Sequence, residues 1–91
     1  MSYRLLVAED NVATAQIEKF ALEQAGYDVT TAANGSEAWD QLAESEFDLV
    51  LADEQMPRMT GRELRRHMCS HEELAKIPFI LLTAKRWEIE R

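Results

Sequence analysis

The chain is poor in several residue types, and each shortage excludes a class of protein. Among its 91 residues there is one cysteine, Cys69, so no disulfide can form within the chain, as is typical of the reducing cytoplasm. No apolar run approaches the roughly 18 residues that a membrane span needs, and no signal peptide opens the sequence. We therefore expect a single cytoplasmic domain that makes no contact with a membrane.

Basic residues are also scarce. The chain has 10 Lys and Arg against 17 Asp and Glu, which gives a net charge of −7. A surface that binds nucleic acid needs an excess of positive charge to hold the phosphate backbone. We therefore expect that this domain does not bind nucleic acid.

Four short apolar runs are typical of β-strands, because each is bounded by charged or turn residues. They lie at 5–8, 27–31, 49–52 and 79–82. The first, third and fourth are apolar at consecutive positions, which favours strands covered on both faces. The second run alternates and is more polar, which predicts a strand at the edge of the sheet.

Amphipathic segments separate these runs. The first, at 12–25, ends before Gly26, a residue suited to a helix C-terminus. Its residues at helical spacing are Ile17, Phe20, Ala21 and Gln24. A second helix is predicted to be capped by Ser36, and a third begins at Thr60 and Glu63, which have the spacing of a capping box. Trp39 in the second helix is interpreted as a packing residue.

The alternation of strands and helices predicts the fold class. Strands joined by helical crossovers are parallel, and the crossovers are right-handed, which gives a three-layer α/β sandwich. Ligands in such sheets bind beyond the carboxyl ends of the strands, where the strand order reverses. For the last nine residues, 83–91, we expect a loop and the start of a further helix.

Polar residues stand at those carboxyl ends. Glu9 and Asp10 follow the first strand, Asp53 ends the third, and Thr83 follows the fourth. Each acid alone is more simply a turn residue or a helix cap. If the first and third strands are neighbours, however, three carboxylates crowd together, and a cation among them offsets their repulsion. Mg²⁺ is the expected ion, because it binds one or two carboxylates together with water and phosphate oxygens.

An aspartate beside Mg²⁺ can act as a nucleophile toward phosphorus and form an acyl phosphate. The metal offsets the charge on the nucleophile and on the phosphoryl group, and it positions the donor for in-line attack. The hydroxyl of Thr83 can then hydrogen-bond a phosphoryl oxygen. The residues thus predict phosphoryl transfer to Asp53.

Three motifs along the chain resemble the response-regulator receiver family of two-component signalling. They are 5–11 (LLVAEDN), 48–57 (DLVLADEQMP) with Gly61, and 82–84 (LTA). The resemblance implies a flavodoxin-like receiver fold with strand order 2-1-3-4. It implies that Asp53 is the phosphorylated residue and that Thr83 and Ala84 form the switch that contacts the phosphoryl group. The implied Mg²⁺ ligands are Glu9, Asp10, Asp53 and the backbone carbonyl of Gln55.

The resemblance also implies partners and a role. The phosphoryl donor would be a histidine kinase or a histidine phosphotransfer protein. Phosphorylation would switch a protein-interaction surface in a phosphorelay. Such a domain is a signalling phosphoacceptor rather than an enzyme, since it catalyses at most its own phosphorylation and dephosphorylation.

The sequence departs from the family at its end. The family continues with a lysine that contacts the phosphoryl group, a last strand and a last helix, and Lys85 follows Thr83 too closely to be that lysine. Residues 1–91 are therefore expected to form a receiver domain that is incomplete at its C-terminus. Without the last strand, Phe79–Leu82 would be an apolar edge that can pair with another chain, which predicts a possible homodimer.

Three alternatives stay open. A pseudo-receiver, regulated without phosphorylation, is favoured by the missing lysine and disfavoured by the acids. A phosphohydrolase with an aspartyl nucleophile is disfavoured because Gln55 stands where haloacid-dehalogenase-like enzymes have a second aspartate. His67 and His71, four residues apart, could share a helix face as metal ligands, although the sequence indicates no third ligand.

Overall fold

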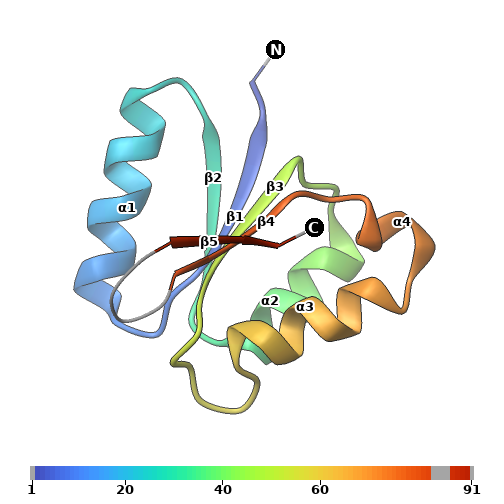
Figure 1. The fold of residues 1–91 in the computed structure, drawn as a ribbon. Helices are drawn as coiled ribbons and strands as arrows, with labels where there is room; N and C mark the ends of the chain where they lie inside the picture. Colours follow the sequence, from blue (N-terminus) through green and yellow to red (C-terminus); the bar gives the residue numbers. More distant parts are fainter. Residues whose placement is uncertain (1, 83–86, 91) are drawn as a thin grey trace.

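The computed structural model describes residues 2–82 and the backbone of 87–90, and it shows a central sheet between two layers of helices. Helix α1 lies on one face, and α2, α3 and α4 lie on the other (Figure 1). The strands are β1 Arg4–Ala8, β2 Asp28–Ala32, β3 Leu49–Asp53, β4 Phe79–Leu82 and β5 Trp87–Glu90. The helices are α1 Val12–Gln24, α2 Gly35–Glu44, α3 Gly61–Cys69 and α4 Glu72–Ala75. The predicted three-layer α/β sandwich is confirmed.

The sheet has the order β2-β1-β3-β4-β5, and its first four strands are parallel. The predicted order 2-1-3-4 and the edge position of β2 are therefore confirmed. The chain adds β2 on one side of β1 and then adds β3 on the other side. The order in which strands are added therefore reverses between β1 and β3. That reversal point is where parallel α/β sheets hold their ligands.

The end of the chain corrects two predictions. Residues 87–90 form β5, which pairs antiparallel with β4, instead of starting a helix. Consequently β4 is not an edge strand, so the predicted open edge at Phe79–Leu82 is wrong, and the homodimer expected through that edge loses its structural basis. The physical reason is that the hydrogen-bonding edge of β4 is completed by its own chain. The alternating pattern at 87–90, WEIE, has the period of two that suits a strand.

Capping side chains set where two of the helices begin. The predicted capping box of α3 is confirmed: Glu63 N donates to Thr60 Oγ1 at 3.2 Å, and Thr60 N donates to Glu63 Oε1 at 3.0 Å. The predicted cap at Ser36 is wrong, because Asn34 caps α2 and accepts a 2.8 Å hydrogen bond from Glu37 N. Asn34 has the extended backbone that a cap requires, whereas Ser36 already lies inside the helix.

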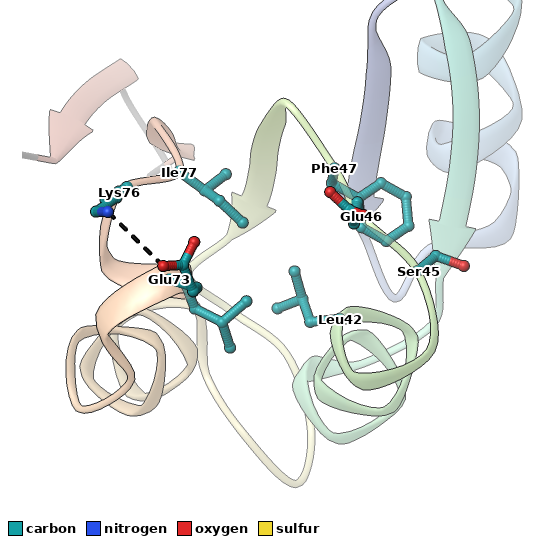
Figure 2. A pocket seen from close by; sticks show the side chains of 8 residues that line it. Leu42, Ser45, Glu46, Phe47, Glu73, Lys76 and Ile77 are labelled. Carbon is teal, nitrogen blue, oxygen red and sulfur yellow. Dashed lines mark ion pairs between the residues drawn. The ribbon is translucent and has the colours of Figure 1, made fainter.

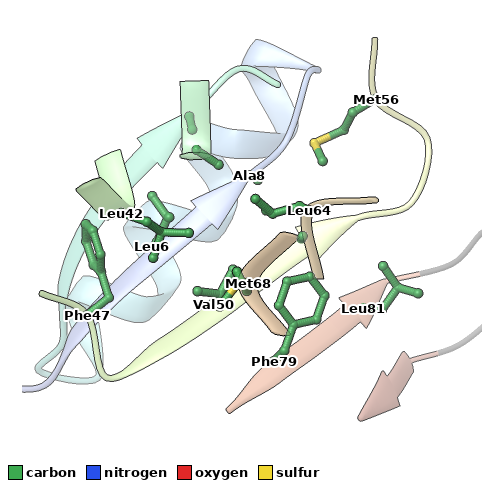
Figure 3. Close-up of a cluster of buried hydrophobic side chains, with 13 residues drawn as sticks. Leu6, Ala8, Leu42, Phe47, Val50, Met56, Leu64, Met68, Phe79 and Leu81 are labelled. Atoms are coloured by element: carbon green, nitrogen blue, oxygen red, sulfur yellow. The ribbon is translucent and has the colours of Figure 1, made fainter. Parts of the chain in front are cut away.

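The main core cluster lies between the sheet and the α2–α3 layer (Figure 3). Its larger members are Leu6, Leu42, Phe47, Val50, Met56, Leu64, Met68, Phe79 and Leu81. A smaller cluster of Leu5, Val7, Val29 and Leu51 faces α1. Consecutive residues of β1 and β3 thus enter opposite clusters, which explains their unbroken apolar runs.

Helix α1 turns its most apolar face to solvent. Ile17 and Phe20, which share the face noted in the sequence, are 69% and 65% exposed. Ala15 and Leu22, seven residues apart, are instead the apolar residues that face the sheet. Helix α1 therefore contacts the sheet through a narrow apolar stripe that contains Ala15 and Leu22. None of the helices among the described residues has the length and apolar character to cross a bilayer.

Gly61 approaches the end of β3 so closely that a side chain cannot fit. A Cβ there would lie 2.7 Å from the carbonyl oxygen of Asp53 and 2.5 Å from Leu81 Cδ1. We expect Gly61→Ala to lower the free energy of unfolding by about 1–3 kcal/mol, because the backbone of β3 must shift. Urea denaturation measures this loss. Arg66→Ala, on the exposed side of the same helix, should stay within about 0.5 kcal/mol of the native chain, and equal losses in both variants would contradict the steric account.

Candidate functional site

Three carboxylates converge at the carboxyl ends of β1 and β3. Glu9 and Asp10 follow β1, and Asp53 is the last residue of β3. The two strands are neighbours in register, with Ala8 opposite Ala52, so their next residues emerge side by side. One carboxylate oxygen from each acid lies within 4.8 Å of the others, a grouping that could hold a metal ion. The predicted proximity is confirmed, while the roles of the three residues stay predictions.

Backbone hydrogen bonds fix these acids in place. Glu9 is only 6% exposed, its N–H donates to the carbonyl of Ala32 at 2.9 Å, and its Oε2 accepts from Asn11 N at 3.1 Å. Asp53 Oδ1 accepts a 3.1 Å hydrogen bond from the N–H of Gln55. Asp10, in contrast, is exposed. The arrangement therefore combines one buried, one half-buried and one exposed carboxylate.

Burial is the main cause of the raised pKa values of Glu9 and Glu18 at this site. The pKa of Glu9 is raised to about 7, first because burial disfavours its charged form. The charges of Asp53 and Glu18 and a hydrogen bond with Asp10 raise this pKa further, while the N–H of Asn11 opposes the shift. A cation bound between the carboxylates would favour the charged form instead. The cluster is thus poorly compensated on its own and well suited to a hard cation.

Glu18 is a neighbour of the site that the motifs do not reveal. It is half-buried on α1, and its pKa is raised by burial and then by the charge of Asp53. The signal that could have found it is helical spacing. Glu18 lies three residues after Ala15 and four before Leu22, so it shares the inward face of α1. A fourth carboxylate therefore contributes to the negative potential at Asp53.

The loop between β3 and α3 is held by Glu54. Its Oε2 lies 2.6 Å from Arg62 Nε, and its Oε1 accepts from Arg62 N at 3.1 Å. The carbonyl of Glu54 accepts from Gly61 N at 3.4 Å, which closes the loop. Gln55 is exposed, and its N–H contacts Asp53, so it lies next to the carboxylates as the sequence predicts. A metal contact by its carbonyl stays a prediction.

The predicted switch residues Thr83 and Ala84, with Lys85, lie outside the described residues. The last described residue before them is Leu82, which lies opposite Asp53 in the pairing of β3 and β4. The carbonyl of Leu82 accepts a 3.0 Å hydrogen bond from Glu54 N. The last described residue of β4 is therefore anchored at the candidate site.

The two histidines form an aromatic group instead of a metal site. Trp39 lies 5.6 Å from the His67 ring and 5.2 Å from the His71 ring, measured between ring centroids. Within 2–82, the grouping of three potential metal ligands that occurs is the acidic one at Asp53, so no third ligand joins the histidines. Trp39 also packs against the main core, as predicted, while Cys69 is exposed at the end of α3.

The sequence matches the model of the response regulator receiver domain over residues 5–90. The chain therefore belongs to the response-regulator receiver family, a signalling module of two-component systems. The resemblance in the three motifs is thereby confirmed.

Two curated relatives are named as probable transcriptional regulators. A probable transcriptional regulator, ycf29, from Porphyra purpurea is 41% identical over 86 residues, which are 93% of this chain and 41% of that protein. Its counterpart from Pyropia yezoensis is 37% identical and is covered over 38% of its length. The chain thus spans about two fifths of the length of these curated relatives.

Solved structures share the fold. The receiver domain of a signal transduction histidine kinase from Syntrophus aciditrophicus matches with a TM-score of 0.88 and 36% identity, over 90% of this chain and 62% of that one. The chemotaxis response regulator CheY4 of Vibrio cholerae matches with a TM-score of 0.90 and 30% identity, over 93% and 71%. A sensor histidine kinase receiver domain from Pseudomonas aeruginosa has a magnesium ion coordinated in its active-site cleft. It matches with a TM-score of 0.88 and 28% identity, over 93% and 70%.

Proposed function

We propose that this receiver domain accepts a phosphoryl group on Asp53 in a reaction that depends on Mg²⁺. The observation that supports this most directly is the convergence of Glu9, Asp10 and Asp53, with carboxylate oxygens within 4.8 Å of one another. Four neighbouring acids, counting Glu18, make an apolar or anionic ligand at this position unfavourable. A divalent cation fits the all-oxygen donor set.

In this proposal Glu9, Asp10, Asp53 and the backbone carbonyl of Gln55 would hold the ion. When bound, the ion supplies positive charge that offsets the charges of the carboxylate and the phosphoryl group. A carboxylate oxygen of Asp53 attacks phosphorus in line with the leaving group. The bond between phosphorus and the imidazole nitrogen of the donor breaks, and an aspartyl phosphate forms. The N–H of Gln55 donates to Oδ1 of Asp53, so we assign the attack to the second carboxylate oxygen, Oδ2.

The partners and the output follow from the same proposal. A histidine kinase or a histidine phosphotransfer protein in the cytoplasm would donate the phosphoryl group to the receiver domain formed by residues 1–91. Thr83 and Ala84 would contact the phosphoryl oxygens and change a protein-interaction surface. The curated relatives are named as transcriptional regulators, so control of transcription is the output that we propose for the whole protein.

Intact mass spectrometry after incubation with acetyl phosphate tests this function. With millimolar Mg²⁺ the chain should gain one phosphoryl group, and it should gain none when EDTA removes the metal. The gain should disappear on brief treatment with hydroxylamine, because that reagent cleaves acyl phosphates. A folded chain that stays unmodified with Mg²⁺ would contradict the proposal and favour a pseudo-receiver.

A further inference from the structure

A second hollow lies at the opposite end of the sheet from the acids. It has a volume of about 540 Å³ and opens between the α2–β3 connection and the α4–β4 connection (Figure 2). Its size falls within the roughly 300–1,000 Å³ typical of ligand pockets. We call it the amino-end pocket, because Phe47 and Ile77, which line it, precede β3 and β4. None of its lining residues takes part in the proposed phosphorylation.

The inner wall of the amino-end pocket is apolar. Leu42 and Phe47 are each 6% exposed and belong to the main core cluster. Leu74 and Ile77 are half-buried and pack against that cluster. Figure 2 shows Leu42 and Ile77 directed toward the space between the two connections, with Phe47 on the side away from Ile77. The pocket is therefore a place where the core comes to the surface and can accept one more apolar side chain.

The rim of the pocket carries unbalanced negative charge. Lys76 is paired with Glu73, with 3.7 Å between Nζ and Oε1. Arg4, beside the pocket, has its guanidinium 5.1 Å from the Phe47 ring centroid and its Nε 3.8 Å from Asp28 Oδ2. Both nearby cations thus have acidic partners.

Glu46 provides the surplus charge. It is exposed on the rim, and the structure records no ion pair for it among residues 2–82. Glu44 lies beside it in an adjoining hollow that shares Leu42 and Ser45 with the pocket. With a net charge of −7 on the whole chain, this end of the sheet attracts cations and repels a second copy of the chain.

We propose that the amino-end pocket binds a peptide segment of a partner protein that presents a leucine or phenylalanine side chain next to arginine or lysine. The apolar side chain fills the space between Leu42, Phe47 and Ile77. The neighbouring cation pairs with Glu46. This combination satisfies both features of the pocket, since an apolar group alone leaves the rim charge unused and a cation alone leaves the inner wall open.

The test uses three peptide probes and ¹⁵N-resolved NMR of the 91-residue chain. The probes are acetyl-Phe-Arg-Arg-amide, acetyl-Ser-Arg-Arg-amide and acetyl-Phe-Glu-Glu-amide. The first should shift the backbone signals of residues 42–47 and 73–77 with a millimolar dissociation constant. The second and third should bind at least about tenfold more weakly, because each lacks one half of the recognition.

A matched pair of variants separates the charge from the fold. Glu46→Gln should weaken binding of acetyl-Phe-Arg-Arg-amide about three- to fivefold, as expected for one exposed ion pair. Glu72→Gln, which removes an exposed acid of α4 that does not line the pocket, should leave it unchanged. Shifts centred on Asp10 and Asp53, equal binding of the three probes, or no effect of Glu46→Gln would each overturn the proposal.

Discussion

Replacing Asp53 by asparagine is expected to abolish phosphoryl uptake completely. Changing an acid outside the group of Glu9, Asp10 and Asp53 to its amide should leave the uptake intact. The amide lacks the charged oxygen that attacks phosphorus, and no neighbouring acid has the same position at the end of β3. Asn is nearly isosteric with Asp, so the half-buried site keeps its shape. Loss of the Asp53 charge also relieves one of the interactions that raise the pKa values of Glu9 and Glu18.

Intact mass after incubation with acetyl phosphate and Mg²⁺ measures this effect. Asp40→Asn is the matched control, because it makes the same chemical change on the exposed side of α2. The Asp40 variant should be modified as fully as the native chain. If the Asp53 variant is still modified to the same extent, another residue accepts the phosphoryl group and the assignment is wrong.

The metal-free protein is expected to lose stability as the pH rises from about 4.5 to about 7. Glu9 has a folded pKa of about 7 against 4.5 for an ordinary glutamate, so the folded state binds more protons than the unfolded state within that window. The free energy of unfolding therefore falls with rising pH, by at most about 3 kcal/mol, since one pKa unit corresponds to about 1.4 kcal/mol. The raised pKa of Glu18 acts in the same direction.

Urea denaturation in EDTA at a series of pH values tests this dependence. Glu9→Gln should flatten the profile, while Glu23→Gln, at an exposed position of α1, should not. Mg²⁺ should restore stability near pH 7.5, because an ion that binds only the folded state stabilises it by mass action. A native chain whose stability rises between pH 4.5 and 7 would contradict the burial of Glu9 as an uncompensated acid.

The sequence predicts the sheet and the acidic site because both depend on local pattern. Consecutive apolar residues in β1 and β3 indicate strands covered on both faces, and the resemblance to the receiver family implies that these two strands are neighbours. Their adjacency brings Asp10 and Asp53 to one end of the sheet. The position of Glu18 depends on how α1 rotates about its axis. Ala15 and Leu22 face the sheet in the structure. The larger apolar side chains of Ile17 and Phe20 lie on the exposed face of α1, so hydrophobicity alone predicts the wrong face as the buried one.

The end of the chain could not be predicted for a different reason. The alternation at 87–90 covers only four residues, which is too short to distinguish a strand from the start of a helix, and the pairing of these residues depends on the free edge of β4, a tertiary feature. The cap of α2 is a closer competition. Asn34 and Ser36 are both good capping residues, and the structure begins the helix after the earlier one, where the Asn34 side chain accepts from Glu37 N.

The main core cluster has a thermodynamic consequence. It contains Phe47 at the amino-end pocket and Met56 in the loop that follows Asp53, and Figure 3 shows these two side chains at opposite ends of it. The two proposed sites therefore share one body of packed side chains. If phosphorylation changes the affinity of the pocket for a peptide by some factor, peptide binding must change the equilibrium of phosphorylation by the same factor. In that case a partner bound at the pocket would respond to the phosphorylation of Asp53 and would also shift its equilibrium.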